Sequence, residues 1–395
     1  VSNEDNKSRI NLNLIYFQPI VKLRNLLPYS ITYSIQGIDE AYDVPIGSDA
    51  DLSLIKLGET GLFVTLCNYL NYDWICHKKL SAFGEDNEVF TWTFTAVGCV
   101  ERRTTDLAVS LTIEQSSVII SIFSPFWMFN KTSQDLVYKL DDEHQISHCG
   151  DAKEQTILLC FKPKTFFSKK KLSVSIGGSQ FSDGFSIDVV GSRGNIICKS
   201  KNGRFNYYAS VEIQLSRINL TKIVIIKSFY NVINSSLRNI EVSEDNDEWL
   251  KINSLTKNSF WPKLSSNPIL RIRKEGSSIG SKAFSLKEST SYLVLADDIY
   301  FNVFVESNEN EIVIKIDDYF DGAAPAKIIN SLSGCTVKYG QINAGMVLPP
   351  NQSVLFTWKD PLKDRQFVYK INDSQEQSAS LDQDGAVRVE GHYNN

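Results

Sequence analysis

A pattern of one asparagine between two apolar segments occurs four times along the chain. In the fullest copy, an aromatic-rich segment from Ile119 to Phe129 ends at Asn130, and Leu136 and Tyr138 follow six and eight residues after it. The short amide of asparagine can hydrogen-bond backbone groups two residues further on, and asparagine tolerates left-handed backbone. The pattern therefore predicts a strand, a sharp turn at the asparagine and a second strand.

The spacing of the four copies sets the size of the repeating unit. The copies are marked by Asn25, Asn130, Asn234 and Asn330, which lie 105, 104 and 96 residues apart. This period exceeds the roughly 20 to 50 residues of solenoid repeats and is close to the roughly 100 residues of a β-sandwich domain. We therefore expect an all-β chain of tandem β-sandwich modules of about 100 residues, packed into a stiff rod or arch.

Positions around the asparagines repeat as well. Apolar residues follow the other three asparagines at the same offsets or one residue later, namely Ile31 and Tyr33, Ile240 and Val242, and Val337 and Tyr339. The two middle copies also align upstream without a gap, where Leu107, Val109 and Leu111 lie 104 residues before Val211, Ile213 and Leu215. No segment keeps a helical period beyond about two turns, so short strands separated by turns are predicted. Among the predicted strands are residues 11–17, 52–57, 61–66, 88–95, 172–176, 301–305 and 366–371.

The repeat divides the chain into four modules after a polar lead-in. The predicted limits are residues 1–9 for the lead-in, 10–106, 107–210 and 211–310 for three β-sandwich repeats, and 311–395 for a partial fourth. Apolar segments such as residues 213–226 cross these limits without a flexible linker. Adjacent modules are therefore expected to pack closely against one another rather than to move as separate beads.

Composition and charge exclude several classes of function. Apolar residues make up 42% of the chain, which is enough for packed cores. The net charge of −5 gives no reason to expect nucleic acid as a partner, because nucleic-acid-binding proteins present basic faces. The longest apolar stretch, residues 118–129, is well short of the roughly 20 residues that cross a bilayer. Because the chain begins at Val1 rather than methionine, we expect a fragment of a longer protein.

The cysteines indicate a reducing compartment. There are seven of them, and they do not recur at the repeat period: Cys67, Cys76, Cys99, Cys149, Cys160, Cys198 and Cys335. A secreted repeat protein is expected to carry a disulfide at the same place in each module, so reduced thiols in the cytosol are the favoured interpretation. The alternative is a secreted carbohydrate-binding β-sandwich, which disulfides within modules or glycans would reveal.

Signals for catalysis or metal binding are weak. His144, His148 and Cys149 lie near the acidic residues 141–143, but the segment is polar and ends at a glycine, so a solvated loop is favoured over a metal site. Residues 276–282 contain two glycines and a lysine without the spacing of a phosphate-binding loop, which favours a hairpin loop. No catalytic residue, metal ligand or cofactor is predicted, and the protein is expected not to be an enzyme.

Two other segments and the asparagines have competing interpretations. Residues 317–322 lack the alternating ligands of a calcium loop and are predicted to form a turn. Residues 166–171 combine two phenylalanines with three lysines, and a hairpin tip is favoured over contact with an anionic membrane. Each repeated asparagine is expected to satisfy buried backbone groups at a corner. One or more of them could in addition contact a binding partner, since the two roles are compatible.

Several segments together resemble one known family. They are Leu23–Tyr29 (LRNLLPY), Ser124–Thr132 (SPFWMFNKT), Trp249, Phe260–Pro262 (FWP), Asp321–Ala324 (DGAA) and Phe356–Pro361 (FTWKDP). These segments resemble the adaptor-binding region of the chorein proteins, the vacuolar protein sorting-associated protein 13 family, over essentially the whole chain. The resemblance implies six β-sandwich repeats, each with a characteristic asparagine, of which this chain holds about three and a half. The residues that match those asparagines are Asn25, Asn130, Asn234 and Asn330.

The resemblance also implies a function. The parent proteins are long bridges that carry lipid between membranes at organelle contact sites, and this region docks short proline-x-proline peptides of organelle adaptors. The chain is then a non-enzymatic targeting scaffold, cytoplasmic and peripheral at contact sites of endosomes, mitochondria and the endoplasmic reticulum, which reaches membranes through its adaptors. The alternative within the family is a purely structural spacer, which failure of the complete region to bind such peptides would favour.

The expected mode of binding follows from the fold. β-Sandwiches in a row expose edge strands unless something covers them. A proline-containing peptide is pre-stiffened and lacks a donor at each proline, so it suits such an edge. We therefore expect an adaptor peptide to add as a strand at a module edge near a joint, with its prolines against apolar side chains.

Overall fold

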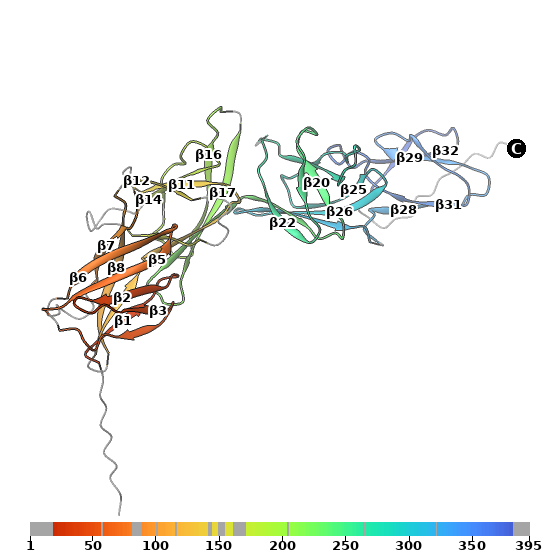
Figure 1. Ribbon diagram of the computed structural model, residues 1–395. Coiled ribbons are helices and arrows are strands. Elements are labelled where there is room, and N and C mark those ends of the chain that lie inside the picture. The colour runs from red at the N-terminus through yellow and green to blue at the C-terminus, as the bar shows by residue number, and fades with distance from the viewer. Residues whose placement is uncertain are drawn as a thin grey trace, which may run out of the picture.

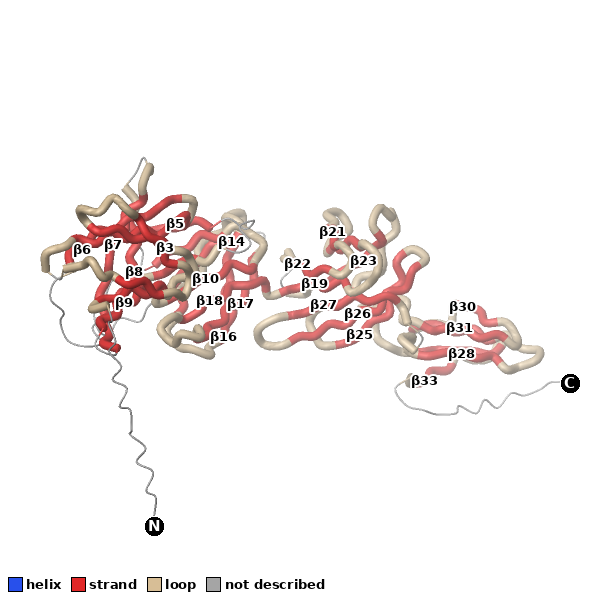
Figure 2. Tube along the Cα trace, turned by 60° about the horizontal axis from the view of Figure 1, so that its bottom comes forward, coloured by secondary structure: helices blue, strands red, loops and turns tan. Residues whose placement is uncertain are grey.

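All regular elements of the structure are β-strands. The computed structural model describes residues 19–381 except 57, 81–88, 100–101, 115–116, 141–143, 149–154, 161–170, 204, 264–265 and 321. No helix occurs among these residues, so the all-β prediction is confirmed. The strands form four groups that follow one another in an elongated, bent row (Figure 1, Figure 2).

These groups are called modules 1 to 4. Module 1 comprises β1 (Val21–Asn25), β2 (Ile31–Ile35), β3 (Ala41–Val44), β4 (Asp49–Asp51), β5 (Gly61–Tyr69), β6 (Tyr72–Lys79), β7 (Val89–Ala96), β8 (Thr104–Glu114) and β9 (Ser117–Phe123). Module 2 comprises β10 (Phe126–Lys131), β11 (Leu136–Leu140), β12 (His144–His148), β13 (Ile157–Leu159), β14 (Lys171–Ile176), β15 (Phe185–Ser186), β16 (Arg193–Lys199), β17 (Asn206–Leu215) and β18 (Lys222–Ser228). Module 3 comprises β19 (Tyr230–Asn234), β20 (Ile240–Ser243), β21 (Leu250–Ile252), β22 (Thr256–Phe260), β23 (Ile269–Lys274), β24 (Phe284–Ser285), β25 (Thr290–Ala296), β26 (Ile299–Ser307) and β27 (Ile312–Asp318). Module 4 comprises β28 (Ala326–Asn330), β29 (Val337–Gln341), β30 (Met346–Leu348), β31 (Gln352–Phe356), β32 (Phe367–Ile371) and β33 (Gln377–Ala379).

The first three modules share one topology. In module 2, a sheet of order β13-β10-β18-β17-β16 packs on a sheet of order β12-β11-β14-β15, and module 3 has the orders β22-β19-β27-β26-β25 and β21-β20-β23-β24. Module 1 repeats this order, but its two sheets are continuous because β6 and β7 pair at Trp74↔Ala96 and Ile75↔Thr95. Each of these modules is therefore a β-sandwich, as the sequence predicts.

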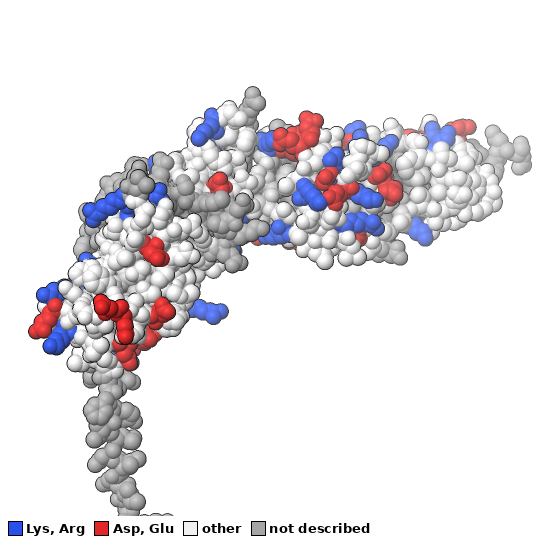
Figure 3. Space-filling model, viewed as in Figure 1, with Lys and Arg blue, Asp and Glu red and all other residues white. Residues whose placement is uncertain are grey.

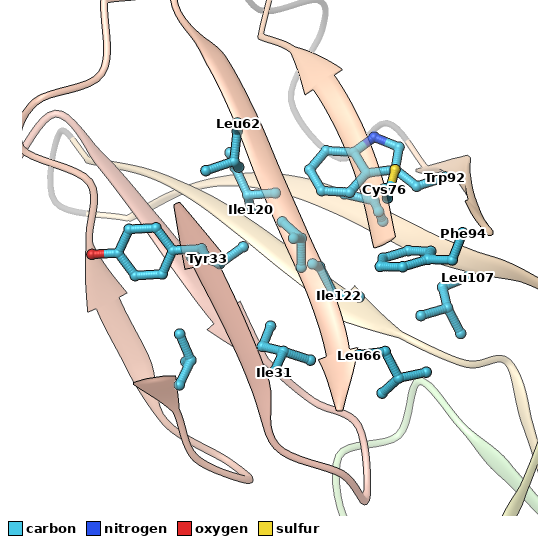
Figure 4. Close-up of a cluster of buried hydrophobic side chains, with 14 of the residues drawn as sticks. Ile31, Tyr33, Leu62, Leu66, Cys76, Trp92, Phe94, Leu107, Ile120 and Ile122 are labelled. Carbon is cyan, nitrogen blue, oxygen red and sulfur yellow. The ribbon is translucent and has the colours of Figure 1, made fainter. Parts of the chain in front are cut away.

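Each module has its own hydrophobic core. Alternate residues of β1 and β2 are buried, which is the two-residue period of strands that place one face on a core. In module 1 the core brings Ile31 and Tyr33 of β2 together with Ile120 and Ile122 of β9 (Figure 4). The apolar residues that follow each asparagine lie in these cores, which explains why that part of the sequence pattern repeats.

The first strand of modules 1 to 3 pairs in parallel with the last strand of the same module. β1 pairs with β9, β10 with β18, and β19 with β27. The next module then begins at once, because two residues separate β9 from β10 and one residue separates β18 from β19. Each sandwich is thus closed by strands from its two ends, and the joints between modules 1, 2 and 3 are very short.

Hydrogen bonding groups the strands differently from the limits expected from the sequence. The limits after residues 106 and 210 fall inside β8 and β17, whose partners belong to the sheets of modules 1 and 2. The limit after residue 310 falls just before β27, which pairs with β19 and β26. By sheet membership, modules 1 to 3 therefore end with β9, β18 and β27.

Three local predictions are corrected by the structure. Residues 52–56 form a turn instead of a strand. Leu52 contributed to the apolar pattern of this segment because its side chain belongs to the core of module 1. His144 to His148 form β12, which pairs with β11, instead of a solvated loop. The turn predicted from residue 317 begins only after β27 ends at Asp318. The parts of the sequence predictions that lie outside the described residues are 1–9, 11–17, 57, 88, 141–143, Cys149, 166–170, 321 and 382–395.

Truncation of a core residue should loosen only its own module. Leu270 of β23 is fully buried in module 3, so Leu270→Ala should lower that module's free energy of unfolding by about 2–5 kcal/mol. Hydrogen exchange should accelerate in residues 230–318 and stay unchanged in residues 19–80. The matched control Leu237→Ala, at a side chain that is 81% exposed, should change neither. Equal acceleration in every module would contradict separate cores.

Candidate functional site

The asparagine corners are the most regular feature of the structure. Asn25 is buried at the end of β1, where its Nδ2 donates to Tyr29 O at 2.8 Å and to Val44 O at 3.0 Å. Its Oδ1 accepts from Leu27 N at 3.0 Å. One amide therefore ties the end of β1 both to the turn that follows it and to the last residue of β3.

The same geometry recurs at the other three corners. The Nδ2 contacts are Asn130 to Gln134 O at 2.8 Å, Asn234 to Arg238 O at 2.8 Å and Ile252 O at 3.2 Å, and Asn330 to Cys335 O at 2.9 Å and Leu348 O at 3.1 Å. The Oδ1 atoms accept from Thr132 N at 3.0 Å, Ser236 N at 3.1 Å and Leu332 N at 3.1 Å, respectively. Asn234 and Asn330 are buried like Asn25, whereas Asn130 is partly exposed.

We propose that these asparagines are structural. A buried amide persists where its hydrogen bonds are made, and here backbone groups take both its donor and its acceptor atoms. Asn25, Asn234 and Asn330 are too deeply buried to meet a partner directly. Their replacement would therefore affect partner binding only by changing the backbone conformation of the corner.

A buried serine fixes each of the two short joints. In both, the Oγ shares its proton between a carbonyl of the first strand and a carbonyl of the fourth strand of the next module. The distances are 2.9 and 3.0 Å from Ser124 Oγ to Phe126 O and Leu159 O, and 2.7 and 3.1 Å from Ser228 Oγ to Tyr230 O and Phe260 O. Both serines lie six residues before an asparagine, and Ala324 holds that position before module 4.

Aromatic side chains pack across the same joints. Trp127 of module 2 contacts the core of module 1, and Tyr208 and Phe229 contact the core of module 3. Tyr29 of module 1 donates to Thr156 O of module 2 at 2.7 Å. Burial raises the pKa of Tyr29 to about 12, so this hydroxyl keeps its proton at neutral pH. Modules 1 to 3 are therefore in direct contact through partly buried aromatic side chains.

The described residues do not assemble a metal-binding cluster. No group of three His, Cys, Asp or Glu side chains among them could hold an ion. Cys67, Cys76, Cys99, Cys198 and Cys335 are free thiols, and burial raises the pKa of the Cys76 and Cys198 thiols to about 11, which makes those two poor nucleophiles. Residues 276–282 connect β23 to β24, in agreement with the predicted hairpin loop. Within the described ranges, no helix has the length and apolar character to cross a membrane.

In the part of module 2 that the structure describes, β16 is an open edge strand whose one strand partner is β17. Lys199 O accepts from Gln180 N on the side away from β17. Alternate residues of an antiparallel strand face the same side, so the backbone groups of Asn195 and Ile197 also face outward. Among the described residues, none hydrogen-bonds these backbone groups on that side.

The open edge of β16 lies beside the joint between modules 2 and 3. Asn195 Nδ2 donates to Glu309 O of module 3 at 2.7 Å. Ile197 is 47% exposed and lies opposite Tyr208, which packs on the core of module 3. The edge therefore offers outward backbone groups and an exposed apolar side chain at one place.

A surface hollow of about 490 Å³ lies at the same joint. Its lining comprises residues 308–311 together with Arg193, Ser210, Val211, Glu212 and Lys227. Four of its five charged side chains are paired, because Arg193 contacts Glu212 and Lys227 contacts Glu311, each at 2.9 Å, and the fifth is Glu309. Charges of both signs are also interspersed over the face of the molecule shown in Figure 3. The hollow thus has the character of a polar groove rather than of a site for one strongly charged ligand.

These features describe a scaffold of tandem β-sandwiches with an open edge near a joint. The sequence matches the family described as vacuolar-sorting associated protein 13, adaptor binding domain, over residues 11–372. The chain therefore belongs to the vacuolar protein sorting-associated protein 13 family and contains its adaptor-binding domain. The resemblance seen in the sequence is confirmed.

Full-length relatives agree with this assignment. The chain is 31% identical to the intermembrane lipid transfer protein VPS13A of Mus musculus over 91% of its own length. It is 32% identical to the intermembrane lipid transfer protein VPS13C of Homo sapiens, and also to that of Mus musculus, over 90% of its length. The chain spans only 11% of the first relative and 10% of the other two.

Sequence reasoning missed the joint serines and the open edge. Ser124 and Ser228 share a position relative to the asparagine, so a closer alignment of the repeats would have found them. β16 gave no comparable signal, because residues 196–198 have the composition of an ordinary paired strand. Whether a strand lies at an edge depends on its neighbours in space and not on its own residues.

Removal of one corner amide should loosen the module that contains it. Asn234→Ala leaves the carbonyls of Arg238 and Ile252 without their donor, which should cost about 1–3 kcal/mol. Hydrogen exchange should accelerate in module 3 and remain unchanged in module 1, and Asn25→Ala should give the reverse. The control Asn267→Ala, at an exposed asparagine of module 3, should have no effect. Unchanged protection in Asn234→Ala together with lost partner binding would make Asn234 a contact residue.

Proposed function

We propose that this chain is a non-enzymatic scaffold that binds adaptors and thereby directs a lipid transfer protein to membrane contact sites. The observation that carries the proposal is the match of residues 11–372 to an adaptor-binding domain, in relatives named as intermembrane lipid transfer proteins. In this function the chain is cytoplasmic and reaches the membrane through its adaptors. The joints and separate cores hold the modules in a fixed row, so a docked adaptor has a defined place on the bridge.

The bound segment in this proposal is extended and carries a proline-x-proline motif. When a segment pairs antiparallel with an edge strand, alternate residues point their N–H groups toward the edge and the others point theirs away. Two prolines separated by one residue belong to the same set. Both proline nitrogens, which carry no hydrogen, can therefore face away from the edge. Both rings then lie on one face of the added strand and can pack on the same apolar side chain.

The outer edge of β16 suits this segment best. Asn195 and Ile197 supply outward backbone groups, and Ile197 supplies an exposed apolar contact for the prolines. The corresponding edge of module 3 is less accessible, because Arg365 Nη2 of module 4 donates to Ser291 O of β25 at 3.2 Å. Exposed Lys199 at the end of β16 favours a partner with acidic residues next to its motif.

Peptide titration followed by amide NMR tests the proposal. A proline-x-proline peptide should shift the amide signals of Asn195 and Ile197, and its alanine-x-alanine counterpart should bind more weakly. A peptide with two residues between the prolines should bind at least about tenfold more weakly, because one proline then faces the edge without a donor. Binding that is equal for all three peptides would contradict the proposed pairing.

Two matched variants locate the binding edge. Ile197→Arg removes the apolar contact on β16 and should weaken peptide binding at least about tenfold. Ile113→Arg makes the same change at an exposed isoleucine of module 1 and should leave binding unchanged. Undiminished binding by Ile197→Arg would place the peptide elsewhere. Absence of binding by this chain would contradict the β16 site, and absence of binding by the complete six-repeat region as well would favour a structural spacer.

A further inference from the structure

Two neighbouring loops of module 2 expose apolar side chains that the core does not use. One loop, residues 187–192, joins β15 to β16, and the other, residues 216–221, joins β17 to β18. The loops are adjacent, because Lys222 Nζ donates to Asp188 O at 2.6 Å. The apolar side chains on and beside them, each between 37% and 62% exposed, are Val189, Val190, Leu215, Ile218 and Leu220. These five side chains are called the apolar tip of module 2.

The second loop is held in a defined conformation. Ser216 and Thr221 at its base are buried, whereas all four residues between them are exposed. Ser216 N donates to Thr221 O at 2.9 Å. Thr221 Oγ1 donates to Ser124 O at 2.8 Å in the joint between modules 1 and 2. The loop therefore presents Ile218 and Leu220 to the solvent from a fixed base.

Module 3 has the same two loops without the exposed apolar residues. Its loops, residues 286–289 and 308–311, join β24 to β25 and β26 to β27. The first begins with buried Leu286, as the loop of module 2 begins with buried Ile187, and continues as Lys-Glu-Ser. The second reads Asn-Glu-Asn-Glu. Since the same sandwich forms with polar residues here, folding does not require the apolar tip, and exposed apolar patches mark sites of interaction.

Basic side chains surround the apolar tip. Arg217 on the second loop is exposed and has no ion-pair partner among the described residues, and the same holds for Lys171, which lies opposite Ser186. Lys222 follows the second loop directly, and Asp188 is the one acidic residue on either loop. The tip thus combines apolar side chains with an excess of positive charge.

This combination fits the surface of an anionic membrane. Apolar side chains on an exposed loop can enter the lipid headgroup region, while arginine and lysine beside them attract acidic lipids. An extended peptide would need a strand edge, whereas these side chains lie on loop ends. We propose that the apolar tip of module 2 contacts anionic membranes directly, with Ile218 and Leu220 in the headgroup region and Arg217 beside lipid phosphates. This contact is separate from the adaptor-dependent targeting proposed above, and the two together would bind a membrane more tightly than either alone.

Vesicle sedimentation with the full chain tests the proposal. The chain should bind phosphatidylcholine vesicles with about 30% phosphatidylserine at least about fivefold more tightly than vesicles of phosphatidylcholine alone. The double substitution Ile218→Asn and Leu220→Asn should weaken binding to the acidic vesicles at least about tenfold. The matched control, Leu255→Asn with Ile279→Asn at exposed apolar residues of module 3, should leave binding unchanged. Absence of binding to the acidic vesicles, or full binding by the Ile218 and Leu220 variant, would overturn the proposal.

A second substitution and a depth measurement keep the test independent of folding. Val189→Asn, at the most exposed side chain of the tip, should weaken binding to the acidic vesicles at least about threefold. In nanodiscs of the same composition, lipids with a spin label in the acyl chain should broaden the methyl signals of Ile218 and Leu220 in the unaltered chain more than those of Ile279. Equal broadening would show that the tip does not enter the membrane and would overturn the proposal.

The charge requirement is tested separately. Arg217→Gln should reduce the preference for acidic vesicles at least about threefold, whereas Lys257→Gln, at an exposed lysine of module 3, should not change it. An unchanged preference in Arg217→Gln would contradict the assigned role of that side chain.

The vesicles contain no adaptor and no peptide, so the result does not depend on proline-x-proline binding. Ile197→Arg should leave vesicle binding unchanged, and the Ile218 and Leu220 variant should leave peptide binding unchanged. This inference and the adaptor proposal therefore fail independently.

Discussion

The parallel pair between the first and last strands of a module is the constraint on which the rest of the structure depends. Two parallel neighbours start at the same end of a sheet, so the chain enters each sandwich at one end and leaves it at the other. Modules 2 and 3 begin within one or two residues of the strand before them, and buried Ser124 and Ser228 hold the chain at these two joints. A linear row of modules 1 to 3 without linkers follows from this closure.

The sequence predicted the local part of this fold better than its closure. The asparagines and the apolar residues after them mark a strand, a corner and a strand that are close in the chain, so a short pattern captures them. The pairing of β1 with β9 joins segments that are far apart in sequence, and nothing in either segment identifies its partner. The expected module limits consequently cut through β8 and β17. The open edge of β16 escaped prediction for the same reason, since exposure of Ile197 depends on a neighbour that is absent in space.

The edge strands of the sandwiches differ in how accessible they are to a further strand. The edge of β16 is exposed and short of partners, so it suits an extended adaptor segment. The edge of β25 is contacted by Arg365, and β28 has β31 as its one strand partner among the described residues. Three of the four corner asparagines, Asn25, Asn234 and Asn330, are buried, and their amides bond backbone groups of their own module. On this account, the edge strands bind partners, whereas the corner asparagines stabilise the fold.

Residue-resolved hydrogen exchange on the unaltered chain tests the central claim most directly. Closure by a parallel strand predicts that the amides of β1, β10 and β19 exchange slowly, since each strand has partners on both sides. The amides of β28 that face away from β31 should exchange much faster, because β31 is its one strand partner among the described residues, although β28 carries the same asparagine and the same corner bonds. Equal protection of all four strands would contradict the claim that pairing of the first and last strands is what closes a module.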